Sequence, residues 1–146
     1  MSYSWAPTSA HVAAYVTSRT VNYADPGSDT PVGDFTATTY PTLTQVNQLI
    51  QDACAWVTAE VGAVIDPGLA DQATAAASLR AAALVELSYP IRDADVSSTA
   101  SLMFEQAESM RRTLALANAA ATGSTPDSVL PSYSFPDPVW WGDRNI

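Results

Sequence analysis

The feature that most constrains the fold is an alanine-rich stretch in the middle of the chain, which predicts a long helix. Residues 67–89 include the run AAASLRAAALVEL, whose members mostly have high helix propensity. Asp66 is placed to cap this helix, Pro67 suits its first turn, and Pro90 is expected to end it. Alanine buries little area per residue, so the core is expected to be thin although 47% of the residues are hydrophobic. A thin core suggests that neighbouring subunits cover part of the apolar surface.

Three further segments have helical periodicity, and together with the first they predict a mainly α protein. The expected helices run over about 9–18, 42–61, 67–89 and 97–122. Thr42 and Gln45 have the spacing of a capping box, and Gly62 is a plausible stop for the second helix. One face of the fourth helix is predicted to hold Leu102, Met103, Gln106, Met110, Leu114 and Ala117.

These segments predict a small helical bundle of about four helices with two irregular parts. A length of 146 residues suits one domain. We assign the helical domain to residues 1–123, including a long irregular loop at 19–41 after the first helix. Residues 124–146 form a separate segment, predicted to be extended and called here the proline-aromatic tail.

The loop at 19–41 is unusually long for a compact domain, and loops of this length are usually functional or disordered. Its turn formers are Pro26, Gly27, Pro31 and Gly33, and its acidic residues are Asp25, Asp29 and Asp34. Three carboxylates suit a divalent cation, but their spacing fits no EF-hand, so we expect no metal site. The threonine-rich run 34–40 is expected to be extended or to form a short strand.

Few residues in this chain have the chemistry that catalysis needs. His11 is the only histidine, and we expect it on the surface or at a contact. Cys54 is the only cysteine and lies among alanines, so a buried and inert thiol is expected. The absence of lysine excludes a Gly-Lys-Ser/Thr phosphate loop. We therefore expect no enzymatic activity and no cofactor; the alternative is a small enzyme or regulator that uses His11 or the loop aspartates.

The chain is strongly acidic, with a formal net charge of −9 and a sequence pI near 4.1. All six basic residues are arginines, so the chain can neutralise few phosphates and is not expected to bind nucleic acid tightly. The acidity either maintains solubility or forms a wall that repels DNA. No apolar stretch approaches the ~20 residues that span a bilayer, and the first residues do not resemble a signal peptide. A cytoplasmic protein, or one built into a particle there, is expected.

The proline-aromatic tail is the most informative segment for function. Its prolines are Pro126, Pro131, Pro136 and Pro138, and its residues proposed to bind a partner are Tyr133, Phe135, Pro136, Pro138, Trp140, Trp141 and Arg144. Disordered tails are normally poor in aromatic residues, whereas interface hot spots are rich in tryptophan, tyrosine and arginine. We favour docking on a partner; the alternatives are packing against the chain's own helices and β-augmentation of a neighbour after Pro131.

The pattern as a whole resembles the helical head-to-tail adaptor (connector) proteins of tailed bacteriophages. The resemblance rests on four parts of the chain besides the irregular loop. Three are the runs SWAPTSAHVAAYV, YPTLTQVNQLIQDACAWVTAEVG and ATAAASLRAAALVELSY. The fourth is the last helix with the tail ending FPDPVWWGDR, which looks like the same part of adaptors from phages that infect actinobacteria. None of these motifs is catalytic, and together they cover most of the chain.

This resemblance implies a structural virion protein at the head–tail interface. It implies a ring, typically of twelve copies, under the portal protein, which extends the DNA channel and supports the next neck or stopper protein. DNA would pass through without sequence-specific binding. The tail stands where related adaptors carry a segment that reaches the portal, and the loop aspartates would face the lumen or a neighbouring copy. The alternative is another neck component, a stopper or a tail-completion protein.

Overall fold

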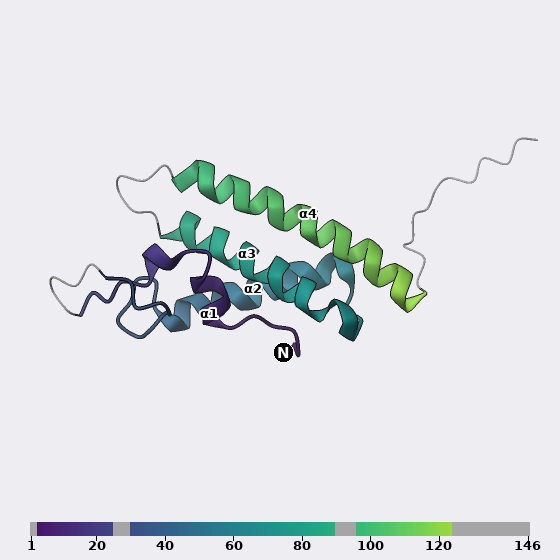
Figure 1. The fold of residues 1–146 in the computed structure, drawn as a ribbon, viewed down its shortest axis with the longest axis horizontal. Helices are drawn as coiled ribbons and strands as arrows, with labels where there is room; N and C mark the ends of the chain where they lie inside the picture. Colours follow the sequence, from purple (N-terminus) through teal and green to yellow (C-terminus); the bar gives the residue numbers. More distant parts are fainter. Residues whose placement is uncertain (1–2, 25–29, 90–95, 124–146) are drawn as a thin grey trace, which may run out of the picture.

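The protein is a bundle of helices in the computed structural model, which describes residues 3–24, 30–89 and 96–123 (Figure 1). In chain order the elements are α1 (Ser9–Ala13), the 3-10 turn η1 (Thr17–Arg19), α2 (Leu43–Val61), the 3-10 turn η2 (Pro67–Leu69), α3 (Ala70–Ser88) and α4 (Val96–Thr122). Within those ranges no segment forms a strand. The prediction of a mainly α protein with about four helices is confirmed.

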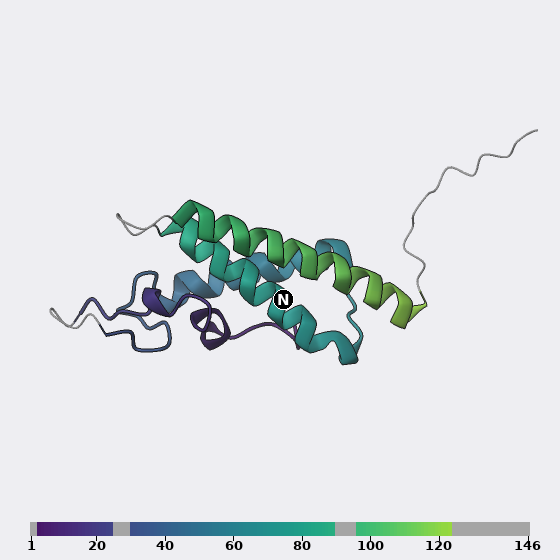
Figure 2. The same cartoon turned by 45° about the horizontal axis from the view of Figure 1, so that its top comes forward.

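Helix α3 is the centre of the bundle and contacts α1, α2 and α4 (Figures 1 and 2). Its buried side chains are mostly alanine: Ala73, Ala76, Ala77, Ala81, Ala82 and Ala83. Side chains this small let the backbones of neighbouring helices approach closely, so one helix can be covered on several sides. The expected thin, alanine-based core is therefore present, and larger side chains from α2 and α4 complete it.

The buried face of α4 differs from the one expected. Ala100, Ala107 and Leu114 are buried at seven-residue spacing, with Met103 and Met110 packed against the core beside them. Leu102, by contrast, is 66% exposed, and Gln106 is also exposed. The prediction was wrong for Leu102 and Gln106. The buried face of α4 is formed partly by Ala100 and Ala107, whose small side chains do not stand out in the sequence as core positions. The buried face itself has the helical spacing that amphipathic packing requires.

The first helix is shorter than expected, since α1 ends at Ala13 instead of continuing to Ser18. The backbone N–H groups of Tyr15 and Val16 bond to carbonyls three residues earlier, a tightening typical of a helix end. Val16 then leaves the helical region at φ −132° and ψ 48°, and η1 follows. The chain turns here so that Arg19 is buried.

Capping residues fix the other helix boundaries. Thr42 and Gln45 form the expected capping box at the start of α2, and Gly62 follows its last residue with a φ of 99°. Asp66 caps η2 as expected, although the α-helical part of this segment begins only at Ala70. Asn118 of α4 closes the connection: its side chain donates to the carbonyls of Val61 and Val64 and accepts from the Asp66 N–H.

The described parts of the long loop are tied to one another by hydrogen bonds. Isolated antiparallel bridges join Val21 to Pro31 and Asn22 to Thr39, and threonine hydroxyls make most of the side-chain bonds. Phe35 points inward and is buried in the core. The run 34–40 is thus folded as turns with a bridge, not as a strand.

Candidate interaction site

Most residues predicted to bind partners lie outside the described part of the chain. This applies to the whole proline-aromatic tail, including Tyr133, Phe135, Pro136, Pro138, Trp140, Trp141 and Arg144, and to Asp25 and Asp29 of the loop. Asp34 is described: it is half-buried, and its carboxylate accepts the backbone N–H of Phe35 at 2.7 Å. Asp34 therefore stabilises a turn.

An ion pair deep in the bundle anchors the start of the loop. The Arg19 Nε–H donates to Glu86 Oε1 at 3.0 Å, and its Nη2 contacts the other carboxylate oxygen of Glu86. The Nη1 of Arg19 donates to the carbonyl of Tyr89 at 2.5 Å. Only 4% of the Arg19 side chain and 12% of the Glu86 side chain are exposed. This fork-shaped contact holds η1 against the C-terminal end of α3.

A pocket of about 480 Å³ lies beside this ion pair, and we call it the tyrosine pocket. It is lined by Ser18, Arg19, Tyr23, Ala37, Thr38, Thr39, Tyr40 and Tyr89. These residues come from three segments: the end of η1 and the bridge region, the turn before α2, and the end of α3. The Arg19 ion pair joins η1 to the end of α3, and the bridge between Asn22 and Thr39 brings in the turn before α2.

Three tyrosine rings give the pocket its chemical character. Tyr40 meets Tyr89 edge to face with ring centroids 5.2 Å apart, and meets Tyr23 edge to face at 6.4 Å. Tyr23 is 64% exposed and Tyr40 is 57% exposed, so both rings offer apolar faces to a ligand. Concave sites with aromatic walls and a few hydroxyl groups are typical of binding sites.

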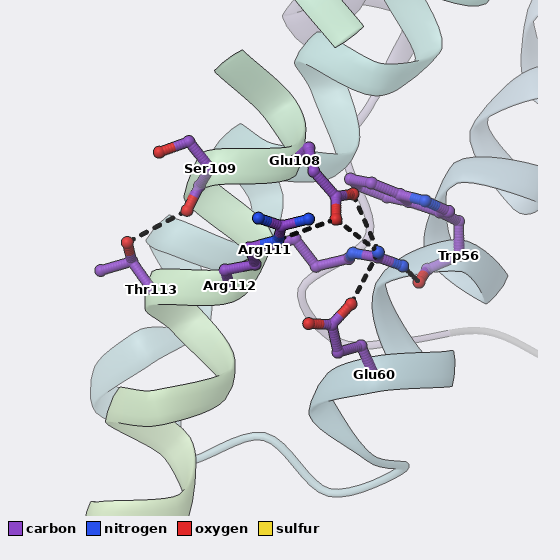
Figure 3. A network of polar contacts seen from close by, with 7 residues as sticks. All are labelled: Trp56, Glu60, Glu108, Ser109, Arg111, Arg112 and Thr113. Carbon is purple, nitrogen blue, oxygen red and sulfur yellow. Dashed lines mark hydrogen bonds and ion pairs between the residues drawn. The ribbon is translucent and has the colours of Figure 1, made fainter. Parts of the chain in front are cut away.

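A second polar cluster joins α2 to α4 on another part of the bundle (Figure 3). Arg111 contacts Glu60 at 2.6 Å and Glu108 at 2.8 Å, and its Nη1 donates to the Trp56 carbonyl at 3.2 Å. Arg112 also pairs with Glu108, at 3.1 Å. Glu108 thus pairs with both arginines, and the hydrogen bond from Arg111, together with both positive charges, lowers the pKa of Glu108.

Two arginines of this cluster stack on aromatic rings. The guanidinium of Arg111 lies 4.2 Å from the Trp56 ring centroid, and that of Arg80 lies 4.8 Å from it and 4.4 Å from the ring of Phe104. Burial, with the positive charge of Arg111 nearby, lowers the pKa of Arg80. The cluster clamps three helices together by cation–π and ionic contacts, and we assign it a structural role.

The two residues considered for catalysis have structural surroundings. The exposed His11 side chain accepts the Thr8 N–H at 3.1 Å and so completes the capping box of α1. Cys54 is fully buried, as expected, and burial raises the pKa of its thiol to about 11. Such a thiol is almost entirely protonated at neutral pH and is a poor nucleophile.

Among the described residues, no group of three or more His, Cys, Asp or Glu side chains is arranged to hold a metal ion. None of the helices in the same ranges combines the length and the apolar character needed to cross a bilayer.

Comparison with protein-family models, with curated proteins and with solved structures found no match for this chain.

The tyrosine pocket and the Arg19–Glu86 pair were both missed by reasoning from the sequence. The two partners of the ion pair are 67 residues apart, so no local spacing relates them. One available indication was Glu86, an acid within an apolar helical run, because a buried acid needs a cationic partner. The tyrosines carry no comparable indication, since each stands alone in its own segment.

Proposed function

We propose that this chain is a structural adaptor of a bacteriophage neck, which forms a ring under the portal protein and extends the DNA channel. Its partners would be the portal, neighbouring copies of itself and the next neck or stopper protein. The observation that carries the proposal is the order of segments that resembles head-to-tail adaptors: a short helix, an irregular loop, three longer helices and a proline-aromatic tail.

Three properties of the chain support this role. The fold is a helical bundle, as the resemblance leads one to expect. The core relies on alanine, and large apolar side chains such as Leu87, Leu102 and Leu116 are more than half exposed, which suits a subunit that is covered by neighbours. The net charge of −9 suits a channel along which DNA must pass without binding.

Electron microscopy of an assembled neck tests the proposal most directly, because it reports copy number, ring position and tail path together. We expect a ring of this chain between the portal and the next neck protein. Mass measurement of virions gives an independent check, and absence of the chain from the particle would end the proposal. Deletion of residues 136–146 should leave the helices folded and abolish docking on the neck.

The alternative is a different neck component, a stopper or a tail-completion protein. Stoppers tend to be rich in β-structure, whereas this fold is helical. The helical fold therefore favours the adaptor, and the position of the density in an assembled neck separates the two roles.

A further inference from the structure

We infer that the tyrosine pocket binds the proline-aromatic tail of a second copy of this chain, through residues 131–141. This inference deepens the self-association that the proposed function includes, and it rests on that part of the proposal. It assigns a receptor to the tail and a ligand to the pocket, neither of which the bundle itself explains.

The chemistry of the tail suits the walls of the pocket. Residues 131–141 read PSYSFPDPVWW, in which proline and aromatic side chains predominate. Extended proline-rich segments dock in grooves lined by aromatic rings, and they lose little conformational entropy because proline is already restricted. Tyr23 and Tyr40 present such rings at the mouth of the pocket.

The described lining of the pocket offers little for electrostatic recognition. Arg19 is the only charged residue among the described lining residues, and Glu86 and the Tyr89 carbonyl already occupy its guanidinium. The tail, for its part, contains no lysine and a single arginine, Arg144. Binding therefore depends on apolar and aromatic contacts, which an aromatic ligand supplies and an anionic or cationic one does not.

The pocket is held open by the fold. The ion pair with Glu86 holds the lining residue Arg19 in place, and the Tyr23 N–H donates to the Thr38 carbonyl at 3.1 Å, which joins two of the lining segments. A site that keeps its shape without a ligand loses little entropy on binding.

The positions of pocket and tail favour a second copy over the same one. Tyr89 follows the end of α3, next to the end of the bundle where α4 begins, whereas the tail follows the opposite end of α4 (Figure 1). With 27 residues, α4 is about 40 Å long at ~1.5 Å per residue. A tail turning back to its own pocket would use about twelve extended residues at ~3.3 Å each, which is residues 124–135, so only residues 136–141 of the docking segment could reach it. The complete segment 131–141 can dock only in the pocket of a second copy.

A contact between opposite ends of two copies is heterologous. An open assembly of any number of copies then keeps one free pocket at one end and one free tail at the other, and such contacts generate closed rings or open filaments rather than isolated dimers. This is the kind of contact that a ring adaptor needs, and it is made without help from any other protein.

A peptide titration tests the pocket as the receptor. The probe is a fluorescently labelled peptide of residues 129–146, titrated with the full chain carrying Trp140→Ala and Trp141→Ala so that its own tail does not compete. We expect saturable binding by fluorescence anisotropy, weakened about tenfold or more by a further Tyr40→Ala. Ala37→Gln, which adds bulk to an exposed lining residue, should weaken binding to a similar extent.

The matched control is Tyr15→Ala, which removes another exposed tyrosine from the groove between α1 and α3 and should leave peptide binding unchanged. Circular dichroism checks that each variant keeps its helices. Absence of peptide binding, or binding that neither Tyr40→Ala nor Ala37→Gln weakens, would overturn the inference.

A mixing experiment tests whether the tail comes from a second copy. The Tyr40→Ala chain keeps its tail, and the Trp140→Ala/Trp141→Ala chain keeps its pocket. Each alone should sediment as a monomer, and a 1:1 mixture should form a dimer and stop there. A mixture that remains monomeric while the peptide binds would show that the tail serves its own chain, against the inference. In either case a ring of the wild-type chain in an assembled neck would leave the proposed function standing.

Discussion

At the scale of single residues, the Arg19–Glu86 pair has the greatest influence on the structure. It lies almost wholly out of water, and it links the start of the loop to the last turn of α3. A buried charge that loses its partner is costly, because water no longer solvates it. The pair therefore holds two of the three segments of the tyrosine pocket, η1 and the end of α3, against each other.

Removing one partner should destabilise the protein strongly. We expect Arg19→Met to lower the free energy of unfolding by about 3–5 kcal/mol, because Glu86 would remain buried without its cation. The double variant Arg19→Met/Glu86→Leu should recover most of this loss. Urea unfolding followed by circular dichroism gives the values.

Arg112→Met is the matched control, since Arg112 also pairs with a glutamate but 71% of its side chain is exposed. Its loss should cost less than about 1 kcal/mol. An Arg19→Met variant as stable as Arg112→Met would contradict the proposed contribution of the Arg19–Glu86 ion pair to stability.

The carboxylate of Glu108 predicts how the second polar cluster responds to acid. The hydrogen bond from Arg111, with the positive charges of Arg111 and Arg112, lowers the pKa of Glu108 in the folded protein. A carboxyl group with a lowered folded pKa stabilises the fold fully above its ordinary pKa, about 4.3, and loses this contribution as pH falls through the folded value.

The wild type should therefore be more stable than Glu108→Gln at pH 7, and the gap should narrow progressively below about pH 4. Urea midpoints of the two proteins between pH 7 and pH 2.5 measure it. A gap that stays constant or widens as pH falls would show that Glu108 is not held as an ion pair.

At the scale of elements, packing around α3 depends on small side chains. Ala81 is fully buried in this helix, which contacts three others. Ala81→Leu would force larger atoms into a close-packed interface and should cost about 1–3 kcal/mol in thermal or urea unfolding. The control is Ala120→Leu, an exposed position on α4 that should change stability by less than about 0.5 kcal/mol. An equal loss of stability at the two positions would mean that the packing around Ala81 accommodates a larger side chain.

The elements also show which parts of the fold the sequence predicts. Helix α2 is predictable almost to the residue because Thr42, Gln45 and Gly62 are local signals at its two ends. The buried face of α4 is harder, because alanines occur all around the helix and exposed leucines such as Leu102 mimic a core position. The first helix is too long in the prediction, since no local residue marks its early end.

Contacts between distant segments explain what the sequence does not predict. The tyrosine pocket takes its walls from residues near 20, near 40 and at 89, and only the folded chain brings them together. Asn118 is similar: its role in closing the connection between α2 and α3 depends on carbonyls more than fifty residues away. A polar residue inside an apolar helical stripe was the available sign, and it indicates a buried partner without identifying one.

At the scale of the whole molecule, the core around α3 is formed without the tail, by the described helices. These helices cover α3 on several sides, and Asn118 of α4 closes the connection between α2 and α3. The buried core around α3 is thus formed by described residues, and the apolar side chains that stay exposed, such as Leu102 and Leu116, lie on the outside of the bundle. Docking outside the chain's own body is the role that we propose for the tail.

The stability of the dilute monomer separates these two roles. If the tail docks on another molecule, Trp140→Ala with Trp141→Ala should change the free energy of unfolding by less than about 0.5 kcal/mol at concentrations below self-association, because no core contact is lost. If the tail packs on its own helices, burying two indole rings would make the same change cost about 3 kcal/mol or more. Urea unfolding, followed by the helical circular dichroism signal, distinguishes the two roles of the tail. The control is Trp56→Ala, which must destabilise the protein because Trp56 packs against the core and stacks with Arg80 and Arg111. A large loss for the tail variant would place the tail within the fold and remove it from the interface.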